Sequence, residues 1–124
     1  MDANGFERME VFQRAYKLSL EIHRASLKLP KVEQYCLAAQ MRRASKSIPA
    51  NLAEGYAKRA SQAEFNRFVQ MAIGSADEMR VWLRYCVDLG YIGKDEWTNW
   101  KAEYVEVAKM LTGLSKAASL KSDV

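Results

Sequence analysis

Apolar residues recur at alternating steps of three and four along four long segments of the chain, and polar residues occupy the opposite side of each segment. This spacing places the apolar side chains on one face of an α-helix. In the first segment the repeating positions are Val11, Ala15, Leu18, Ile22, Ala25 and Leu29. The pattern predicts four helices, at roughly residues 8–29, 33–58, 62–89 and 94–118.

Residues that commonly begin or end helices stand at these boundaries. Pro30 follows the first predicted helix, and Gly90 follows the third. Ser61 and Glu64 have the spacing of a capping box, in which the serine oxygen and the glutamate side chain each satisfy a backbone N–H group at a helix start. The segment 119–124 lies beyond the last apolar repeat, and we expect it to be frayed.

Pro49 interrupts the second predicted helix. A proline inside a helix removes one backbone hydrogen bond and crowds the carbonyl group four residues earlier. The favoured interpretation is one helix that is kinked between residues 45 and 49. The alternative is a true break, with Ser47 capping a new short helix that ends near Gly55.

Four amphipathic helices joined by short connections predict an all-α fold. Such helices pack as an antiparallel up-down-up-down four-helix bundle, with helix axes about 20° apart. A chain of 124 residues fits one domain, and no repeat, low-complexity tract or linker argues for a second. We therefore expect a single domain spanning residues 1–124.

The chain has more large apolar residues than the inner faces of four helices can hold. The surplus consists of Phe12, Tyr16, Leu20, Trp82, Tyr85 and one of the aromatic residues of the fourth helix. Contiguous exposed apolar patches usually mark interfaces, so the surplus predicts a homo-oligomer. The alternative is that these rings lie flat on the bundle or cover the helix ends.

The formal net charge is +4, and the positive excess lies in the first half of the chain. Residues 32–60 contain five Lys or Arg and two Asp or Glu. An excess of this size is compatible with nucleic-acid binding but is also common in proteins that bind none. The first twenty residues contain no signal peptide or membrane-spanning run, and we expect a cytoplasmic protein in which Cys36 and Cys86 are reduced and buried.

Few residues are available for catalysis or metal binding. His23 is the one histidine of the chain, and it is not grouped with Cys36 and Cys86 at the spacing of a metal site. The six glycines form no phosphate-binding loop. Glu54 and Glu78 are expected to be shielded, which is more typical of a structural role than of an acid–base pair. We expect no enzymatic activity, cofactor, metal or small-molecule substrate.

Several motifs in the middle of the chain are specific. They are Gln40-Met41-Arg42-Arg43-Ala44, the run Ser47-Ile48-Pro49-Ala50-Asn51-Leu52-Ala53-Glu54-Gly55-Tyr56, then Glu64, Phe65 and Phe68, and finally Ala72-Ile73-Gly74-Ser75 with Glu78. The chain thereby resembles the four-helix bundle proteins encoded in intervening sequences of bacterial 23S rRNA genes. It departs from them at Ala57, where the family more often has a second glycine.

The resemblance implies a four-helix bundle that assembles as a homo-oligomer, specifically a pentameric ring. A more distant relative of that family is the accessory variability determinant of diversity-generating retroelements. The resemblance therefore also implies similarity to a basic pentamer that partners a reverse transcriptase and nucleic acid.

The residues of these motifs also predict a polar network between the second and third helices. We expect Arg43 to pair with Glu54 or Glu78 in a shielded site near Ser75, and Asn51 to bond the backbone that Pro49 leaves free. The alternative is that these residues touch a ligand.

The favoured function is a non-enzymatic, oligomeric protein that binds the backbone of RNA or DNA. The predicted phosphate contacts are Arg42, Lys46, Lys58 and Arg59, with Arg43 as a further one. The alternative for these cations is a solvated helix face, because no interleaving of aromatic and basic residues typical of base recognition appears. The second functional hypothesis is a protein-interaction scaffold that docks a partner such as a polymerase or reverse transcriptase.

Overall fold

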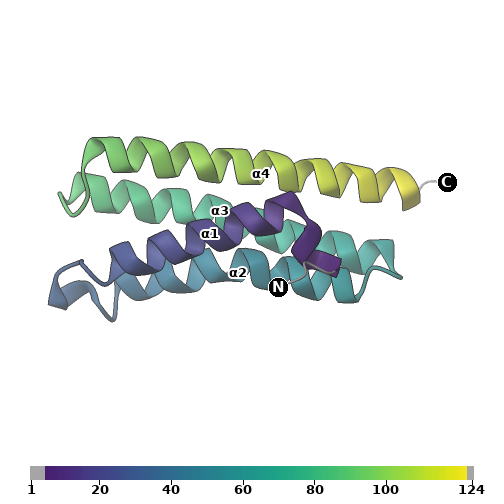
Figure 1. Cartoon of the computed structure of the whole chain (residues 1–124), viewed down its shortest axis with the longest axis horizontal. Coiled ribbons are helices and arrows are strands. Elements are labelled where there is room, and N and C mark those ends of the chain that lie inside the picture. Colours follow the sequence, from purple (N-terminus) through teal and green to yellow (C-terminus); the bar gives the residue numbers. More distant parts are fainter. Residues whose placement is uncertain (1–4, 123–124) are drawn as a thin grey trace.

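The computed structural model describes residues 5–122, with side chains up to residue 119. The long helices are α1 (Glu10–Ser26), α2 (Leu37–Ala57), α3 (Gln62–Asp88) and α4 (Lys94–Ser122), and two short 3-10 helices are η1 (Gly5–Arg8) and η2 (Lys31–Glu33). In Figure 1 the long helices lie side by side, and the sequence colours run in opposite directions along successive helices. The described residues contain no strand, and the predicted all-α four-helix bundle is confirmed.

The core lies where the inner faces of the four helices meet. Its largest fully buried apolar side chains are Ile22, Met41, Ile48, Leu52, Val69, Met79, Leu83, Tyr104, Val107 and Leu111. Burial of one such aliphatic side chain contributes roughly 1.5–3 kcal/mol. The hydroxyl group of Tyr104 is buried with them and has no hydrogen-bond partner among the described residues.

Helix α1 ends at Ser26, before the predicted end at Leu29. The amide group of Gln34 donates to the carbonyl oxygens of Ser26 and Leu29 at 2.9 and 3.0 Å. The Leu29 N–H group donates to the Ser26 carbonyl at 3.2 Å. A side chain from beyond Pro30 thus satisfies carbonyl groups that a helix end leaves free.

Helix α2 begins at Leu37, later than the predicted start at residue 33. The residue before it, Cys36, has φ −119° and ψ −104°, which lies outside the helical region. The helix then runs without interruption through Pro49, so the alternative of a separate short helix capped by Ser47 was wrong. A kink at Pro49 remains a prediction.

Helix α3 begins with half of the predicted capping box. The Ser61 hydroxyl accepts a hydrogen bond from the Glu64 N–H group at 3.2 Å. The Glu64 carboxylate instead accepts from Arg67 at 2.8 Å, and this contact lowers the pKa of Glu64. The Ser61 N–H group donates to the Lys58 carbonyl, so the capping box was wrong in its reciprocal half.

The connection from α3 to α4 turns at Gly90, which has φ +77°. The Tyr91 N–H group donates to the Cys86 carbonyl at 2.8 Å, a bond that closes helices ending in a left-handed glycine. The predicted stop at Gly90 is confirmed.

Helix α4 extends to Ser122, so the prediction of fraying from residue 119 was wrong for residues 119–122, while residues 123–124 lie outside the described part. Its end is held on α3 by the hydroxyl of Ser115, which lies 2.6 Å from both Asn66 Oδ1 and Gln70 Nε2. The nearby Ala118 is buried as well. Packing on α3 therefore extends the helix beyond the last large apolar residue of its sequence pattern.

Candidate nucleic-acid interface

The five predicted phosphate contacts lie at two separate places on α2. Arg42, Arg43 and Lys46 stand in its first half, whereas Lys58 and Arg59 follow its last residue. Lys58 follows Lys46 by twelve positions, which corresponds to about 18 Å along a helix axis. The structure therefore does not bring all five cations together.

Arg42 uses its guanidinium group inside the protein. It donates to Ser26 Oγ at 2.9 Å and to the Gln34 carbonyl at 2.7 Å. Gln34 also holds the end of α1, so Arg42 fastens that end and the following connection to α2. Its charge still contributes to the local potential, but several of its N–H donors are occupied.

Arg43 lies on another face of α2 and contacts α3. Its Nη2 atom lies 3.3 Å from Glu78 Oε2, and it also bonds Gln40 Oε1. The pairing of Arg43 with Glu78 is as expected, but the expected shielding was wrong, because the Arg43 side chain is 67% exposed and Glu54 is exposed. An exposed pair of this kind contributes at most about 1 kcal/mol.

The rest of the predicted network joins α2 to α3 through hydroxyl groups. Ser47 Oγ lies 2.6 Å from Ser75 Oγ. The Asn51 amide donates to the Ser47 carbonyl at 2.8 Å. The carbonyl group that Pro49 leaves free is that of Ser45, four residues earlier, so the expected role of Asn51 was wrong. The Ser47–Ser75 bond therefore joins α2 to α3, whereas the Asn51 bond lies within α2.

Lys46 lies against a histidine that the sequence pattern did not connect with it. The Lys46 Nζ atom is 2.8 Å from Nδ1 of His23 on α1. The Lys46 ammonium is the largest cause that lowers the pKa of His23, followed by burial, Arg42 and Arg24. We call His23, Arg24, Arg42 and Lys46 the α1–α2 cationic patch.

The two cations at the α2–α3 turn lie over aromatic rings. Lys58 Nζ is 5.0 Å from the ring centre of Phe68, and Arg59 Cζ is 4.0 Å from that of Tyr56. Contacts of this kind contribute roughly 0.5–1 kcal/mol each at exposed sites. Tyr56 and Arg59 are only three positions apart, whereas Phe68 belongs to α3 and meets Lys58 across the turn, which the sequence pattern did not show.

Two exposed apolar patches lie on different helices. The α1 apolar patch consists of Phe12, Tyr16 and Leu20, and the Phe12 and Tyr16 rings stack with centroids 6.0 Å apart. The α3 apolar patch consists of Val81, Tyr85 and Leu89, which are 51%, 53% and 54% exposed.

The two patches lie on helices that do not pack against each other. Helix α1 packs against α2 and α4, so α3 lies diagonally across the bundle from it. The predicted partial exposure of the surplus aromatic residues is confirmed, although Phe12 and Trp82 are half-buried against the core.

The remaining chemistry of the described residues is sparse. No group of three or more metal-binding side chains occurs among them, and none of their helices is long and apolar enough to cross a membrane. Both cysteines are free, but Cys36 is exposed, so its predicted burial was wrong. Burial raises the pKa of the Cys86 thiol to about 11.

Comparisons with known proteins agree with this architecture. The model of a family described as "23S rRNA-intervening sequence protein" matches residues 7–113. No curated protein matches the chain. A crystal structure of a protein of unknown function, from the S23 ribosomal protein family of Bacteroides thetaiotaomicron VPI-5482, is similar, with a TM-score of 0.78 and 22% identity over 86% of this chain and 95% of that one. The comparisons indicate no enzyme family.

Proposed function

Because the chain belongs to the family of 23S rRNA-intervening sequence proteins, we propose that it is a non-enzymatic, oligomeric helical bundle that binds the phosphate backbone of RNA or DNA. The α1–α2 cationic patch is the surface that makes the contact. Lys58 and Arg59 at the α2–α3 turn add a second group of cations on the same helix.

One observation carries this proposal. Lys46 Nζ lies 2.8 Å from the His23 ring, and the charges of Lys46, Arg42 and Arg24 all lower the pKa of His23. The α1–α2 cationic patch therefore has a positive local potential, which favours the approach of a polyanion. Lys46 is exposed, so its ammonium group is free to exchange its contact with His23 for a phosphate oxygen. Repetition of the patch in an oligomer multiplies this field.

The two apolar patches support assembly into a ring. A two-fold dimer buries one patch against its own copy, whereas two different patches fit a head-to-tail contact that closes into a ring when the rotation allows. We propose that the α1 apolar patch of one subunit packs on the α3 apolar patch of the next. The family resemblance implies five subunits.

Light-scattering mass tests the ring. We expect Tyr16→Glu and Tyr85→Glu each to abolish assembly, because each places a charge in one half of the same contact. A mixture of the two variants retains one intact contact and is expected to form a heterodimer. A two-fold contact through either patch predicts instead that one of the two variants assembles normally.

Retardation of labelled RNA and DNA by the purified protein tests the binding. Affinity is expected to fall steeply between about 50 and 200 mM salt. Lys46→Gln is expected to reduce the slope of log K against log salt by about 0.7–0.9. Lys94→Gln is the matched control, because Lys94 is also exposed but lies at the start of α4. Absence of retardation even at low salt would contradict the proposal and favour the protein-interaction scaffold.

A further inference from the structure

Helices α3 and α4 form two grooves on the outside of the bundle, and the charges that line them differ. One groove, of about 690 Å³, is lined by Asp77, Arg80, Val81, Arg84, Tyr85, Asp88, Trp97 and Lys101. Its charges are largely paired, since Arg80 lies 3.7 Å from Asp77 and Arg84 lies 2.8 Å from Asp88. This groove offers little net charge to a partner.

The other groove, of about 460 Å³, has cationic groups and no acidic ones. It is lined by Arg80, Val105, Ala108, Lys109, Thr112, Gly113 and Lys116. Lys109 and Lys116 are exposed and form no ion pair or hydrogen bond within the described residues. Their ammonium groups therefore keep their full donor capacity.

The base of this groove has room for a nucleic-acid strand. Outside the backbone of α4 itself, no described atom lies within 4 Å of the position that a Cβ atom at Gly113 would occupy, so the helix surface is open there. Thr112 uses its hydroxyl on the Ala108 carbonyl, and no aromatic ring lines the groove. The groove suits contacts with a sugar–phosphate backbone and offers no platform on which bases could stack.

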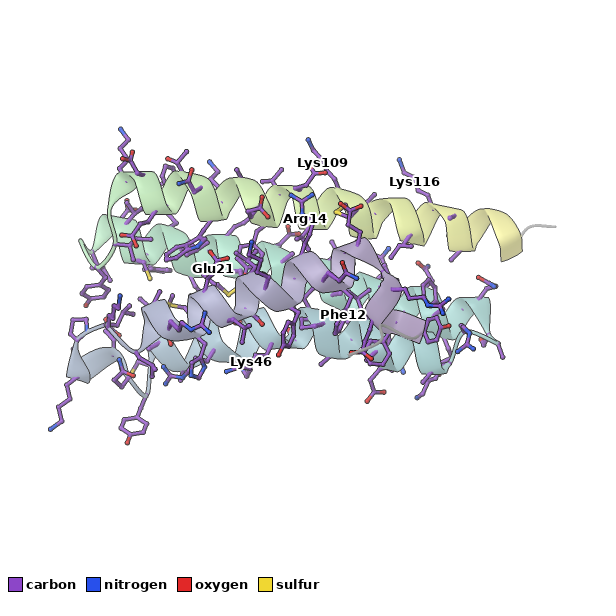
Figure 2. All side chains as sticks on the ribbon, in the orientation of Figure 1. Phe12, Arg14, Glu21, Lys46, Lys109 and Lys116 are labelled. Carbon is purple, nitrogen blue, oxygen red and sulfur yellow. The ribbon has the colours of Figure 1, made fainter. Side chains whose placement is uncertain are left out.

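The spacing of the two lysines fits a linear polyanion. They are seven residues apart, which is two helical turns and about 10.5 Å along the α4 axis, and they share one face. Figure 2 shows both side chains projecting from α4 on the side of the molecule away from Lys46. A single compact anion does not bridge such a distance, whereas separate phosphates along one strand do.

We propose that this groove, which we call the α3–α4 cationic groove, is a second binding site for a nucleic-acid backbone. It rests on the proposed function and extends it, because each subunit then holds nucleic acid on two opposite sides of the bundle. Lys109 and Lys116 contact phosphates, while Arg80, which also lies 3.7 Å from Asp77, borders the groove from α3.

Lysine acetylation read by mass spectrometry, with and without a nucleic-acid duplex at low salt, tests the site directly. We expect the duplex to slow modification of Lys109 and Lys116 several-fold and to leave Lys94 unchanged. If the duplex slows modification of Lys46 while Lys109 and Lys116 react at their free rate, the groove is overturned and the proposed function stands. If Lys109 and Lys116 are protected and Lys46 is not, the groove is supported and the α1–α2 cationic patch is excluded.

A charge-matched pair of variants gives an independent readout. Lys109→Gln combined with Lys116→Gln removes two phosphate contacts and is expected to lower the salt slope for duplex DNA by about 1.8. Lys31→Gln combined with Lys94→Gln removes the same charge from exposed positions outside both surfaces. Equal slopes for the two double variants would overturn the groove. Unchanged helical circular dichroism is expected for both, because all four lysines are exposed.

Discussion

Helix α4 has two neighbours, and it meets them through different chemistry. Toward α3 it packs closely along its length, with Val107 and Leu111 fully buried. Toward α1 it approaches at fewer places, and polar contacts join the two helices beside the shared core. Arg14 Nη2 lies 3.1 Å from Glu103 Oε1, and both side chains are partly exposed.

The α1–α4 side also contains the buried hydroxyl of Tyr104, whose pKa is raised by burial and by the charge of Glu21 on α1. Glu21 accepts a hydrogen bond from Trp100 Nε1 at 3.3 Å, and Figure 2 shows Glu21 on α1 beneath α4. Burial of an apolar side chain stabilises the folded protein more than an exposed ion pair does. We therefore expect α3 and α4 to separate last and α1 to leave α4 first.

The largest expected effect compares two leucines. Leu111→Ala opens a cavity beside α3 and is expected to lower the free energy of unfolding by about 4–5 kcal/mol. Leu18→Ala on α1, which packs less extensively on α4 than α3 does, is expected to cost about 2–3 kcal/mol. Urea denaturation followed by circular dichroism measures both. Equal losses would contradict the proposed difference between the two sides of α4.

A smaller effect concerns how the far end of α1 is held. Arg42→Ala leaves the carbonyl of Gln34 and the hydroxyl of Ser26 without their donor, and is expected to cost about 1–3 kcal/mol. Hydrogen exchange at residues 27–34 is expected to accelerate more than in α3. Arg42→Lys keeps the charge but not the guanidinium fork, so it separates this role from phosphate binding. A variant that loses nucleic-acid binding without faster exchange would contradict the fastening role.

Tyr104→Phe is expected to be neutral or to stabilise the protein by up to about 1 kcal/mol, because it removes a buried hydroxyl group that has no partner among the described residues. The midpoint of thermal unfolding measures the change. A loss of stability would show that the hydroxyl is satisfied in solution and that the α1–α4 side is better packed than we infer.

The smallest expected effect is a dependence on pH. The pKa of His23 in the folded protein lies below its usual value of about 6.5, chiefly because of the Lys46 ammonium. The unfolded chain therefore takes up a proton first as the pH falls below about 6.5, and stability decreases in that range.

His23 is the one histidine of the sequence, so its ring proton signals in NMR spectra report this titration directly. Lys46→Gln is expected to move the midpoint upward, and bound nucleic acid is expected to move it in the same direction. A midpoint that does not respond to Lys46→Gln would contradict the contact between the two side chains.

Helical periodicity was sufficient to predict the four helices and most of their core. Val11, Leu18 and Ile22 lie on the inner face of α1, where the pattern placed them. The helix ends were harder to predict, because they depend on side chains from elsewhere. Leu29 continues the apolar repeat of α1, yet the helix ends at Ser26. There Gln34 donates to the Ser26 carbonyl oxygen and Arg42 donates to the Ser26 hydroxyl oxygen.

The candidate site was predicted less completely than the fold, since the sequence shows where charges are but not which of them are neutralised. Arg43 meets Glu78 across 35 positions of the chain. The sequence did not indicate Lys109 and Lys116 as a site, because residues 94–124 contain five basic and five acidic residues. Only the packing of α3 on α4 shows that these two lysines line a groove without acidic residues.

The two thiols of the chain differ sharply in accessibility. Cys86 is enclosed beside Met41 and stays protonated at neutral pH, whereas Cys36 is open to solvent in a hollow that Tyr85 and Leu89 also line. A maleimide dye therefore attaches to one sulfur atom, next to the surface on which we place the neighbouring subunit. The chain thus carries its own attachment point for a fluorophore that reports on assembly.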